Sequence, residues 1–112
     1  MAKFVDVLLP LPLPTTYTYS VPSEHREQVA IGCRVIVPLG KSKKYTALIM
    51  NVHDDEPQGY ETRPFLELLD EAPILLPTQL KLWEWIAKYY LCTQGEIYKA
   101  AVPQGSAATH AE

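Results

Sequence analysis

The sequence LLPLPLPTTYTYSVP occupies residues 8–22 and has two parts. In the first part prolines alternate with leucines. Because proline fixes φ and lacks a backbone donor, this part cannot lie inside a central strand. From Thr16 to Val21, hydroxyl residues alternate with hydrophobic ones at the period of a β-strand. The stretch therefore predicts a stiff, extended segment, the approach, that leads into a β-strand. Tyr17 and Tyr19 lie on one face of this strand, close to its start.

Four further strands are expected around residues 16–21. Each shows the alternation, or the run of β-branched residues, that strands prefer. Their expected bounds are Lys3–Leu9, Gly32–Pro38, Tyr45–His53 and Arg63–Leu69. The connection between the third and fourth strands is short, and Gly40 is expected to supply a positive φ there. These two strands should form a hairpin of the kind found in small, bent barrels.

Two helices are expected after the strands. Pro77 and Thr78 are typical of a helix start, and apolar residues cover most of the helix surface as far as Tyr90. So wide an apolar surface means either that the helix is wedged deeply or that part of it meets another domain. Residues 93–96 match a capping box, which predicts a second, short helix that ends at about Ala101.

The expected fold class is α+β: a bent, barrel-like antiparallel sheet of about five strands, capped by one long and one short C-terminal helix. The 112 residues are 47% hydrophobic and 21% charged, which fits one globular domain. We assign residues 1–104 to this domain. Residues 105–112 are small and polar, and we interpret them as the start of a linker.

The composition also bears on the compartment. No apolar run approaches the ~20 residues needed to span a bilayer, and no secretory leader pattern is present. We therefore expect a cytoplasmic protein without a membrane partner. Cys33 and Cys92 lie far apart in unrelated patterns, which indicates buried thiols and neither a disulfide nor a metal site.

Catalytic and metal motifs are missing from the sequence. The three histidines, His25, His53 and His110, are expected in loops or tails, where such residues are usually solvated. The sequence suggests no catalytic set of a nucleophile with a neighbouring base, and it contains no glycine-rich phosphate loop. The acidic run at residues 54–56 is either a weak cation site or a solvated loop. We therefore expect no catalytic residue, metal or cofactor in these 112 residues.

Three features favour a binding function. Aromatic residues lie at a strand mouth, a glycine at position 40 opens the backbone to a ligand, and lysines follow it at 41, 43 and 44. The net charge is −3, but residues 1–50 carry +3 and residues 51–112 carry −6, so an anion is expected to bind the first half. Together these are the parts needed to hold single-stranded nucleic acid. Taken separately, each has a simpler explanation as a core tyrosine, a hairpin glycine or a solvated lysine.

The motifs that carry a family resemblance are PLPLPTTYTY at residues 10–19, GCRVIVPLGK at 32–41 and WIAKYY at 85–90, followed by GE at 95–96 and AAVP at 100–103. In this order they resemble the amino-terminal domain of the PriA family of primosomal helicases, over about residues 4–103. The resemblance implies a domain that binds the free 3′-terminal nucleotide of the nascent leading strand at stalled forks, independently of base sequence.

The resemblance also implies which positions form the DNA site, and we add a neighbouring lysine as a phosphate contact. The site residues are Tyr17, Thr18, Tyr19, Gly40, Lys41 and Arg63. The family often has aspartate where this chain has Thr18, so a carboxylate contact to the base is replaced by a hydroxyl that both donates and accepts. At position 63 a lysine would supply only charge. Arg63 keeps this charge, and its planar guanidinium adds several N–H donors.

The expected partners follow from the same resemblance. They are the single-stranded 3′ end of forked DNA, the other domains of a parent helicase, and primosome proteins, all in the bacterial cytoplasm. The parent is expected to be an ATP-driven 3′-to-5′ helicase whose ATP, Mg and Zn sites lie in domains other than this one. The alternative function is a protein-interaction module that docks helicase or primosome partners through the aromatic helix at residues 78–90.

Overall fold

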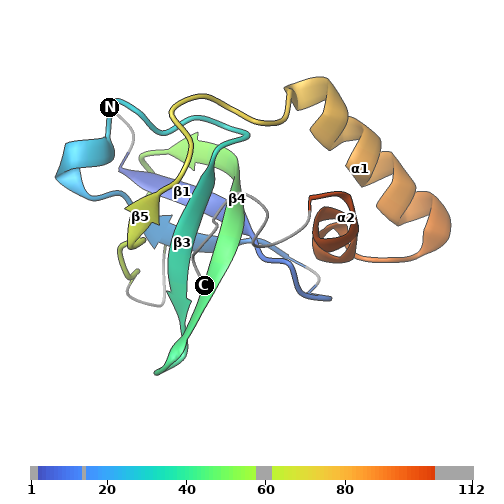
Figure 1. Ribbon diagram of the computed structural model, residues 1–112, viewed down its shortest axis with the longest axis horizontal. Helices are drawn as coiled ribbons and strands as arrows, with labels where there is room; N and C mark the ends of the chain where they lie inside the picture. The colour runs from blue at the N-terminus through green and yellow to red at the C-terminus, as the bar shows by residue number, and fades with distance from the viewer. Residues whose placement is uncertain (1–2, 14, 58–61, 103–112) are drawn as a thin grey trace.

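The computed structural model describes residues 3–13, 15–57 and 62–102, in which five strands form one antiparallel sheet (Figure 1). The strands are β1 (Phe4–Leu8), β2 (Tyr17–Ser20), β3 (Arg34–Leu39), β4 (Lys43–His53) and β5 (Glu67–Leu68). Their order across the sheet is β2-β1-β4-β3-β5. A short 3-10 helix, η1 (Ser23–His25), follows β2. The expected sheet of about five antiparallel strands is confirmed.

The two edges of the sheet are joined by the segment that precedes β5. Ser20 of β2 donates its N–H to the carbonyl of Arg63 at 2.9 Å and accepts from the N–H of Phe65 at 3.2 Å. The next N–H, of Leu66, donates to the carbonyl of Ile36 in β3 at 2.7 Å. The chain thus crosses from the edge strand β2 to β3 and continues there as β5, the other edge strand, which closes the sheet into a small barrel.

The fifth strand is shorter than the sequence predicted. Its pairing with β3 covers Glu67 and Leu68, whereas the expected strand ran from Arg63 to Leu69. The expected bounds were wrong because Pro64 has no N–H to donate and its neighbours bond to β2 instead. The other four strands begin and end within two residues of their expected bounds.

Alternate residues of the strands fill the inside of the barrel, as their period predicts. The buried cluster consists of Val5, Val7, Leu9, Tyr19, Val21, Cys33, Val35, Val37, Ala47, Ile49 and Phe65. Both cysteines are free thiols, but Cys92 is only half-buried, so the sequence prediction of a buried thiol holds for Cys33 and was wrong for Cys92.

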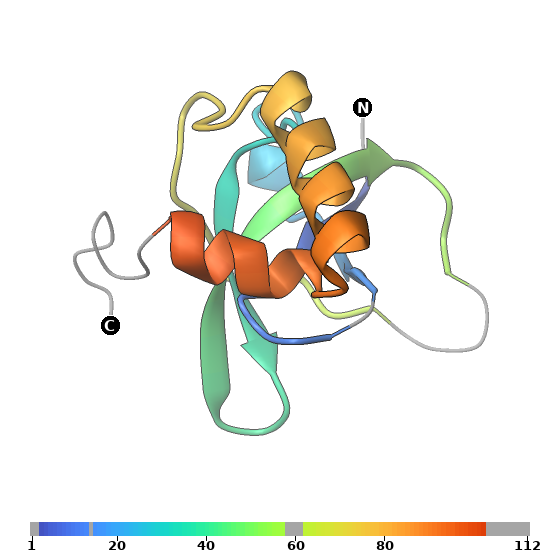
Figure 2. The same cartoon turned by 90° about the vertical axis from the view of Figure 1, so that its right-hand side faces the viewer.

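The two helices, α1 (Pro77–Tyr90) and α2 (Gln94–Ala101), lie on one side of the sheet (Figure 2). A second buried cluster joins them to the outer face of the barrel and consists of Leu8, Leu48, Leu80, Trp83 and Tyr98. The Tyr98 hydroxyl also donates to the carbonyl of Thr46 in β4 at 2.9 Å. The helices therefore cap the barrel through both apolar packing and a polar anchor.

Both helices begin where the sequence predicted. α2 begins with the expected capping box, in which the N–H of Glu96 donates to Thr93 Oγ1 at 3.2 Å and the N–H of Thr93 donates to Glu96 Oε1 at 2.9 Å. α1 begins at Pro77, and Thr78 lies in its first turn, as expected. The N-cap is Leu76, whose N–H donates to the Gln79 side chain at 2.7 Å.

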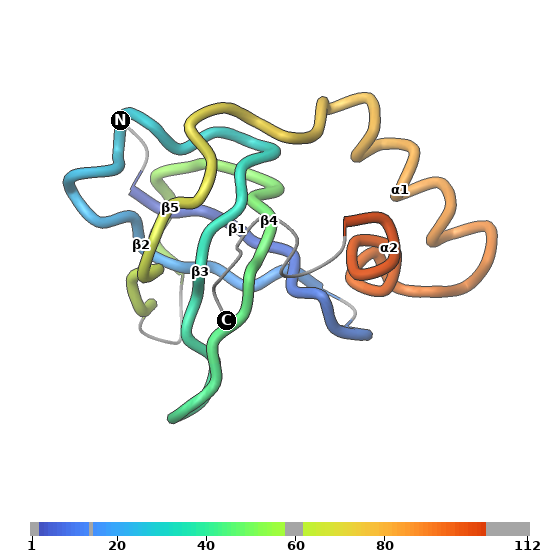
Figure 3. The backbone as a smooth tube through the Cα atoms, in the orientation of Figure 1, coloured from blue at the N-terminus to red at the C-terminus, as the bar shows by residue number. Residues whose placement is uncertain are grey.

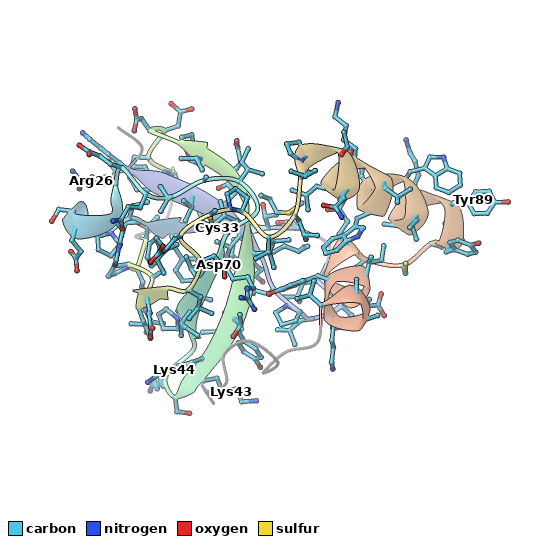
Figure 4. All side chains as sticks on the ribbon, turned by 45° about the horizontal axis from the view of Figure 1, so that its top comes forward. Arg26, Cys33, Lys43, Lys44, Asp70 and Tyr89 are labelled. Carbon is cyan, nitrogen blue, oxygen red and sulfur yellow. The ribbon has the colours of Figure 1, made fainter. Side chains whose placement is uncertain are left out.

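The wide apolar surface of α1 is not explained by deep burial. Leu80 and Trp83 are its buried residues, whereas Trp85, Tyr89 and Tyr90 are 57%, 66% and 67% exposed. In Figure 4 the ring of Tyr89 points away from the barrel at the far end of the helix. Of the two explanations that the sequence left open, the deeply wedged helix was wrong.

α2 ends at Ala101, where the sequence predicted its end. Pro103, expected to stop it, and residues 105–112, expected to start a linker, lie outside the described residues. Within the described ranges, neither helix is long and apolar enough to cross a membrane.

Candidate nucleic-acid interface

The approach to β2 is held against α2. Figure 3 traces the chain from β1 toward α2, where Gly95 lies directly against the carbonyl oxygens of Leu9 and Leu11. A Cβ at position 95 would overlap both oxygens, so only glycine permits this approach. Leu11 and Leu13 pack against the barrel core, and the N–H of Leu13 donates to the carbonyl of Leu11 at 2.8 Å. The start of β2 is thereby fixed in position.

The two tyrosines of β2 have different environments. Tyr17, at the strand start, is 40% exposed, whereas Tyr19 is 5% exposed. The Tyr19 hydroxyl donates to the carbonyl of Pro38 in β3 at 2.7 Å. Tyr19 therefore holds the end of β3 from inside the barrel, and the aromatic surface that β2 offers to a ligand is that of Tyr17.

Gly40 and Arg63 meet next to these tyrosines. Arg63 Nη1 donates to the carbonyl of Gly40 at 2.9 Å. Gly40 has the predicted positive φ, 72°, and among the described residues no atom lies within 4 Å of the place a Cβ would take. Burial raises the pKa of Tyr19, the charge of Arg63 opposes this rise and Tyr17 adds to it, so both neighbours lie within electrostatic reach of Tyr19.

The predicted lysines continue from Gly40 around the β3–β4 turn. Lys41, Lys43 and Lys44 are all exposed. Figure 4 shows Lys43 and Lys44 at the projecting tip of the hairpin, away from the helices. The hairpin therefore presents positive charge on the same turn that carries Gly40.

Thr18 lies on the other face of β2. It faces Asp6 of β1 in the strand register, and its Oγ1 donates to Asp6 Oδ1 at 2.6 Å. The six predicted site residues thus divide into two sets. Four of them, Tyr17, Tyr19, Gly40 and Arg63, gather on one side of the edge strand, Lys41 follows Gly40, and Thr18 projects on the opposite side.

His53 contacts Asp6. The sequence predicted it both as the last residue of the fourth strand, which is confirmed, and as a loop histidine, which was wrong. It is the last residue of β4, it is half-buried, and its Nε2 lies 3.0 Å from Asp6 Oδ1. Its Nδ1 accepts from the N–H of Asp55 at 3.1 Å, so the hydrogen of the neutral ring is on Nε2 and is donated to Asp6. The ring of Phe4 stacks on His53 with centroids 6.1 Å apart.

Asp6 connects three strands. Burial raises its pKa, but hydrogen bonds from Thr18 and His53, the electrostatic effect of His53 and a hydrogen bond from Asn51 outweigh burial and hold the pKa below its ordinary value. In the sequence, Asp6 falls on the polar face of the alternating strand Lys3–Leu9, and the pattern gives it no partner. A single acid between buried valines was the available signal, but naming its partners requires the register of β1 with β2 and β4.

Two of the cavities in the described part of the chain lie beside the helices. One, of about 290 Å³, lies between the sheet and α1 and is lined by Ile31, Met50 and Leu80 among others. The other, of about 430 Å³, lies beside Thr15 and Thr16. Neither of these two cavities is lined by the predicted site residues. Across residues 3–13, 15–57 and 62–102, no three His, Cys, Asp or Glu side chains gather to hold a metal ion.

Comparison with known proteins shows which family the chain resembles. A family model described as "3'DNA-binding domain (3'BD)" of PriA matches residues 6–103. The chain is 34% identical over 103 residues to replication restart protein PriA of Haemophilus influenzae, an alignment that covers 90% of this chain. It is 27% identical over 107 residues to the protein of that name in Treponema pallidum and 26% identical over 111 residues to that of Chlamydia muridarum, with 92% and 96% of this chain covered. These alignments span only 14–16% of the relatives' own lengths.

Proposed function

Because the chain belongs to the PriA family of 3′ DNA-binding domains, we propose that it binds the free 3′-terminal nucleotide of the nascent leading strand at stalled forks, independently of base sequence. The observations that support this proposal are that Tyr17 is exposed, that Arg63 is hydrogen-bonded to Gly40, and that Tyr17 and Arg63 both lie within electrostatic reach of Tyr19. An aromatic ring, an open backbone and a cation in one place suit a terminal nucleotide.

Tyr17 supplies the stacking surface. Its ring is 40% exposed at the first position of β2, and the buried Tyr19 and the approach fixed by Gly95 hold that strand start in place. Stacking of a base on an aromatic ring contributes roughly 1–3 kcal/mol and does not depend on which base is present. This accounts for binding that is indifferent to sequence.

Backbone groups near Gly40 and Thr18 read the free 3′ hydroxyl. Gly40 has no side chain to keep a ligand from the turn. β2 is an edge strand, so its backbone is approachable beyond the point where Ser20 bonds to the chain before β5. A strand that continued past the hydroxyl would clash, and selection therefore depends on shape and on satisfied polar groups.

Lys41 and Arg63 hold one or two phosphates. With so few phosphates engaged, the affinity should fall gently with salt, with a slope of about −0.7 per phosphate for single strands. A site of this kind tolerates the net charge of −3, because it relies little on bulk electrostatic attraction.

The test compares two oligonucleotides of one sequence, one ending in a 3′ hydroxyl and the other in a 3′ phosphate. The domain should prefer the hydroxyl, and equal affinities would remove the proposal. Tyr17→Ala should lower the affinity about tenfold or more, as expected for lost stacking. Tyr90→Ala is the matched control, since it removes an exposed tyrosine of α1 that is not part of the site.

A second candidate function concerns the exposed face of α1. Trp85 and Tyr89 stack at 5.1 Å, Tyr90 meets Tyr89 edge-on at 5.0 Å, and Leu91 beyond them is 93% exposed. So large an apolar surface favours docking of a helicase or primosome partner. A double variant, Trp85→Glu with Tyr89→Glu, should abolish such docking and leave DNA affinity unchanged. Unchanged docking would exclude this face.

The proposal for the whole protein follows from the family. Residues 1–104 would be the 3′-end reader of a bacterial, cytoplasmic, ATP-driven helicase, and the ATP, Mg and Zn sites would lie in its other domains. The chain spans 14–16% of the relatives' lengths, which leaves room for those domains in such a protein. Nucleotide hydrolysis by the complete protein, stimulated by a forked DNA with a free 3′ end, is the matching measurement.

A further inference from the structure

We propose that Asp6 holds the hydroxyl hydrogen of Thr18 in a hydrogen bond, so that Thr18 contacts the terminal nucleotide only as a hydrogen-bond acceptor. This inference rests on the proposed function and deepens it, because it assigns a specificity role to a residue on β1 that does not itself touch the DNA. Asp6 is a positioning residue that acts through Thr18.

The first step is the direction of one hydrogen bond. Thr18 Oγ1 lies 2.6 Å from Asp6 Oδ1, a length typical of a hydroxyl that donates to an ionised carboxylate. A carboxylate has no hydrogen to give, and threonine has one hydroxyl hydrogen. Thr18 must therefore be the donor, and only its lone pairs remain for a ligand.

The second step is that Asp6 is itself fixed. Its Oδ1 also receives His53 Nε2 at 3.0 Å, and the N–H of Asp55 holds the other ring nitrogen at 3.1 Å. Asp6 and Thr18 lie directly opposite each other in the β1–β2 register. The carboxylate is thus held from two strands, and its side chain is 24% exposed, so the pair stays close to the surface.

The third step is what an acceptor selects. A group that only accepts must meet a donor, which on the last nucleotide is either the 3′ hydroxyl or an N–H of the base edge. All four bases carry such an N–H on their pairing edge, so one acceptor does not distinguish among them. A 3′ phosphate instead brings negative oxygens toward lone pairs backed by the Asp6 charge, and this is disfavoured. The Asp6–Thr18 pair thereby supplies both indifference to base and rejection of a blocked end.

The position of β2 allows this contact. Thr18 projects on the opposite face from Tyr17, but β2 is an edge strand, so a nucleotide lying over that edge reaches both side chains. Thr18 is half-buried, so part of the residue is open to solvent at this edge.

The test uses oligonucleotides that differ only in the last nucleotide. The reference ends in deoxyadenosine. A second carries 3′-fluorine, so the sugar cannot donate, and a third ends in unsubstituted purine, so the base cannot donate. The wild-type domain should lose about five- to tenfold in affinity for one of the two altered ends, as for one lost hydrogen bond. Which end it is identifies the donor, and no loss for either end overturns the inference.

Two variants show whether Asp6 is responsible. Thr18→Val should abolish the difference in affinity between the reference end and the altered end. Asp6→Asn should reduce that difference at least threefold, because the new amide donates to Thr18 and frees its hydroxyl hydrogen. Asp55→Asn is the matched control for the loss of one exposed carboxylate. If Asp6→Asn leaves the preference for the free 3′ end unchanged, this inference is wrong but the proposed function still stands. Equal wild-type affinity for 3′-hydroxyl and 3′-phosphate ends overturns the proposed function as well.

A measurement on the unaltered protein does not depend on the variants folding. A hydroxyl hydrogen that is held in a hydrogen bond exchanges slowly with water. Proton NMR of the domain should therefore detect the hydroxyl hydrogen of Thr18. Fast exchange of that hydrogen at neutral pH would overturn the inference, because it would mean that Asp6 does not hold it.

Discussion

The Nη1 atom of Arg63 donates to the carbonyl oxygen of Gly40 across 2.9 Å and joins the segment before β5 to the β3–β4 turn. The two residues are 23 positions apart, and the turn that receives the bond has a left-handed conformation that glycine favours. An arginine has five N–H donors, so one bond to Gly40 leaves others for a phosphate. Under the proposed function, Arg63 would therefore be held in place for a phosphate before DNA binds.

Arg63→Gln should weaken binding of a single-stranded 3′ end about tenfold, which is the effect of roughly one charge-assisted hydrogen bond. The dependence of affinity on salt should become shallower by about 0.7, because one phosphate contact is lost. Fluorescence anisotropy at several salt concentrations measures both quantities. Arg26→Gln makes the same change of charge beside η1 and should leave both nearly unchanged. An equal loss in the two variants would mean that charge acts at long range and that Arg63 has no specific contact.

Gly95→Ala should destabilise the domain by roughly 1–3 kcal/mol, since overpacking at a closed contact costs about that much. The new Cβ would push the carbonyls of Leu9 and Leu11 away and shift the start of β2. Urea denaturation measures the stability, and the affinity for a 3′ end should fall in the folded variant. Ala100→Gly tests the opposite substitution at an exposed position of α2, where the cost is helix propensity of about 1 kcal/mol and DNA binding is unaffected. A more stable Gly95→Ala would show that the approach is not held there.

The fold was largely predictable because its signals are local. The alternation of β1 to β4 follows from each strand having one buried face, and the capping box at Thr93 needs only residues of the same turn. The segment from Arg63 to Leu69 failed because it changes partner from β2 to β3 at Pro64, and no local pattern records which strand a residue will meet.

The candidate site was predictable in its parts and not in its arrangement. The sequence placed Tyr17 and Tyr19 on one face, but how far the barrel covers each ring depends on where β3 ends and on the hydroxyl contact to Pro38. The link from Asp6 to His53 spans 47 positions and follows from the register of β1 with β4, which includes an irregularity beside Asp6. Such a register is a property of the assembled sheet.

Asp70→Asn should destabilise the domain by about 3–5 kcal/mol, the usual result of breaking a buried ion pair by removing one charge. Asp70 accepts from Arg34 Nε at 2.8 Å, from Nη2 at 2.7 Å and from the backbone N–H at 2.9 Å, and both side chains are 10% exposed. Hydrogen bonding to Asp70 raises the pKa of Arg34, so the guanidinium stays charged and would be left unpaired. Chemical denaturation measures the loss. Glu71→Gln, at the exposed next position, is the control and should change stability by less than about 0.5 kcal/mol.

Asp6 should make the stability of the domain fall in acid. Burial raises its pKa, but the hydrogen bonds from Thr18 and His53 prevail and hold the pKa below the ordinary 3.8. A carboxylate with a lowered pKa stabilises the fold fully above its ordinary pKa, and this contribution is lost as the pH falls through the lowered value. The free energy of unfolding of the wild type should therefore exceed that of Asp6→Asn near pH 7, and the difference should shrink below about pH 4.

Urea denaturation from pH 7 to pH 3 measures this difference. Asp55→Asn is the matched control, because its side chain is exposed in the loop after β4 and its backbone N–H, which holds His53, is retained. Its stability curve should run parallel to that of the wild type over the whole range. If the curve of Asp6→Asn runs parallel as well, then Asp6 has the same pKa in the folded and unfolded chains, and the hydrogen bonds it receives do not favour its charged form.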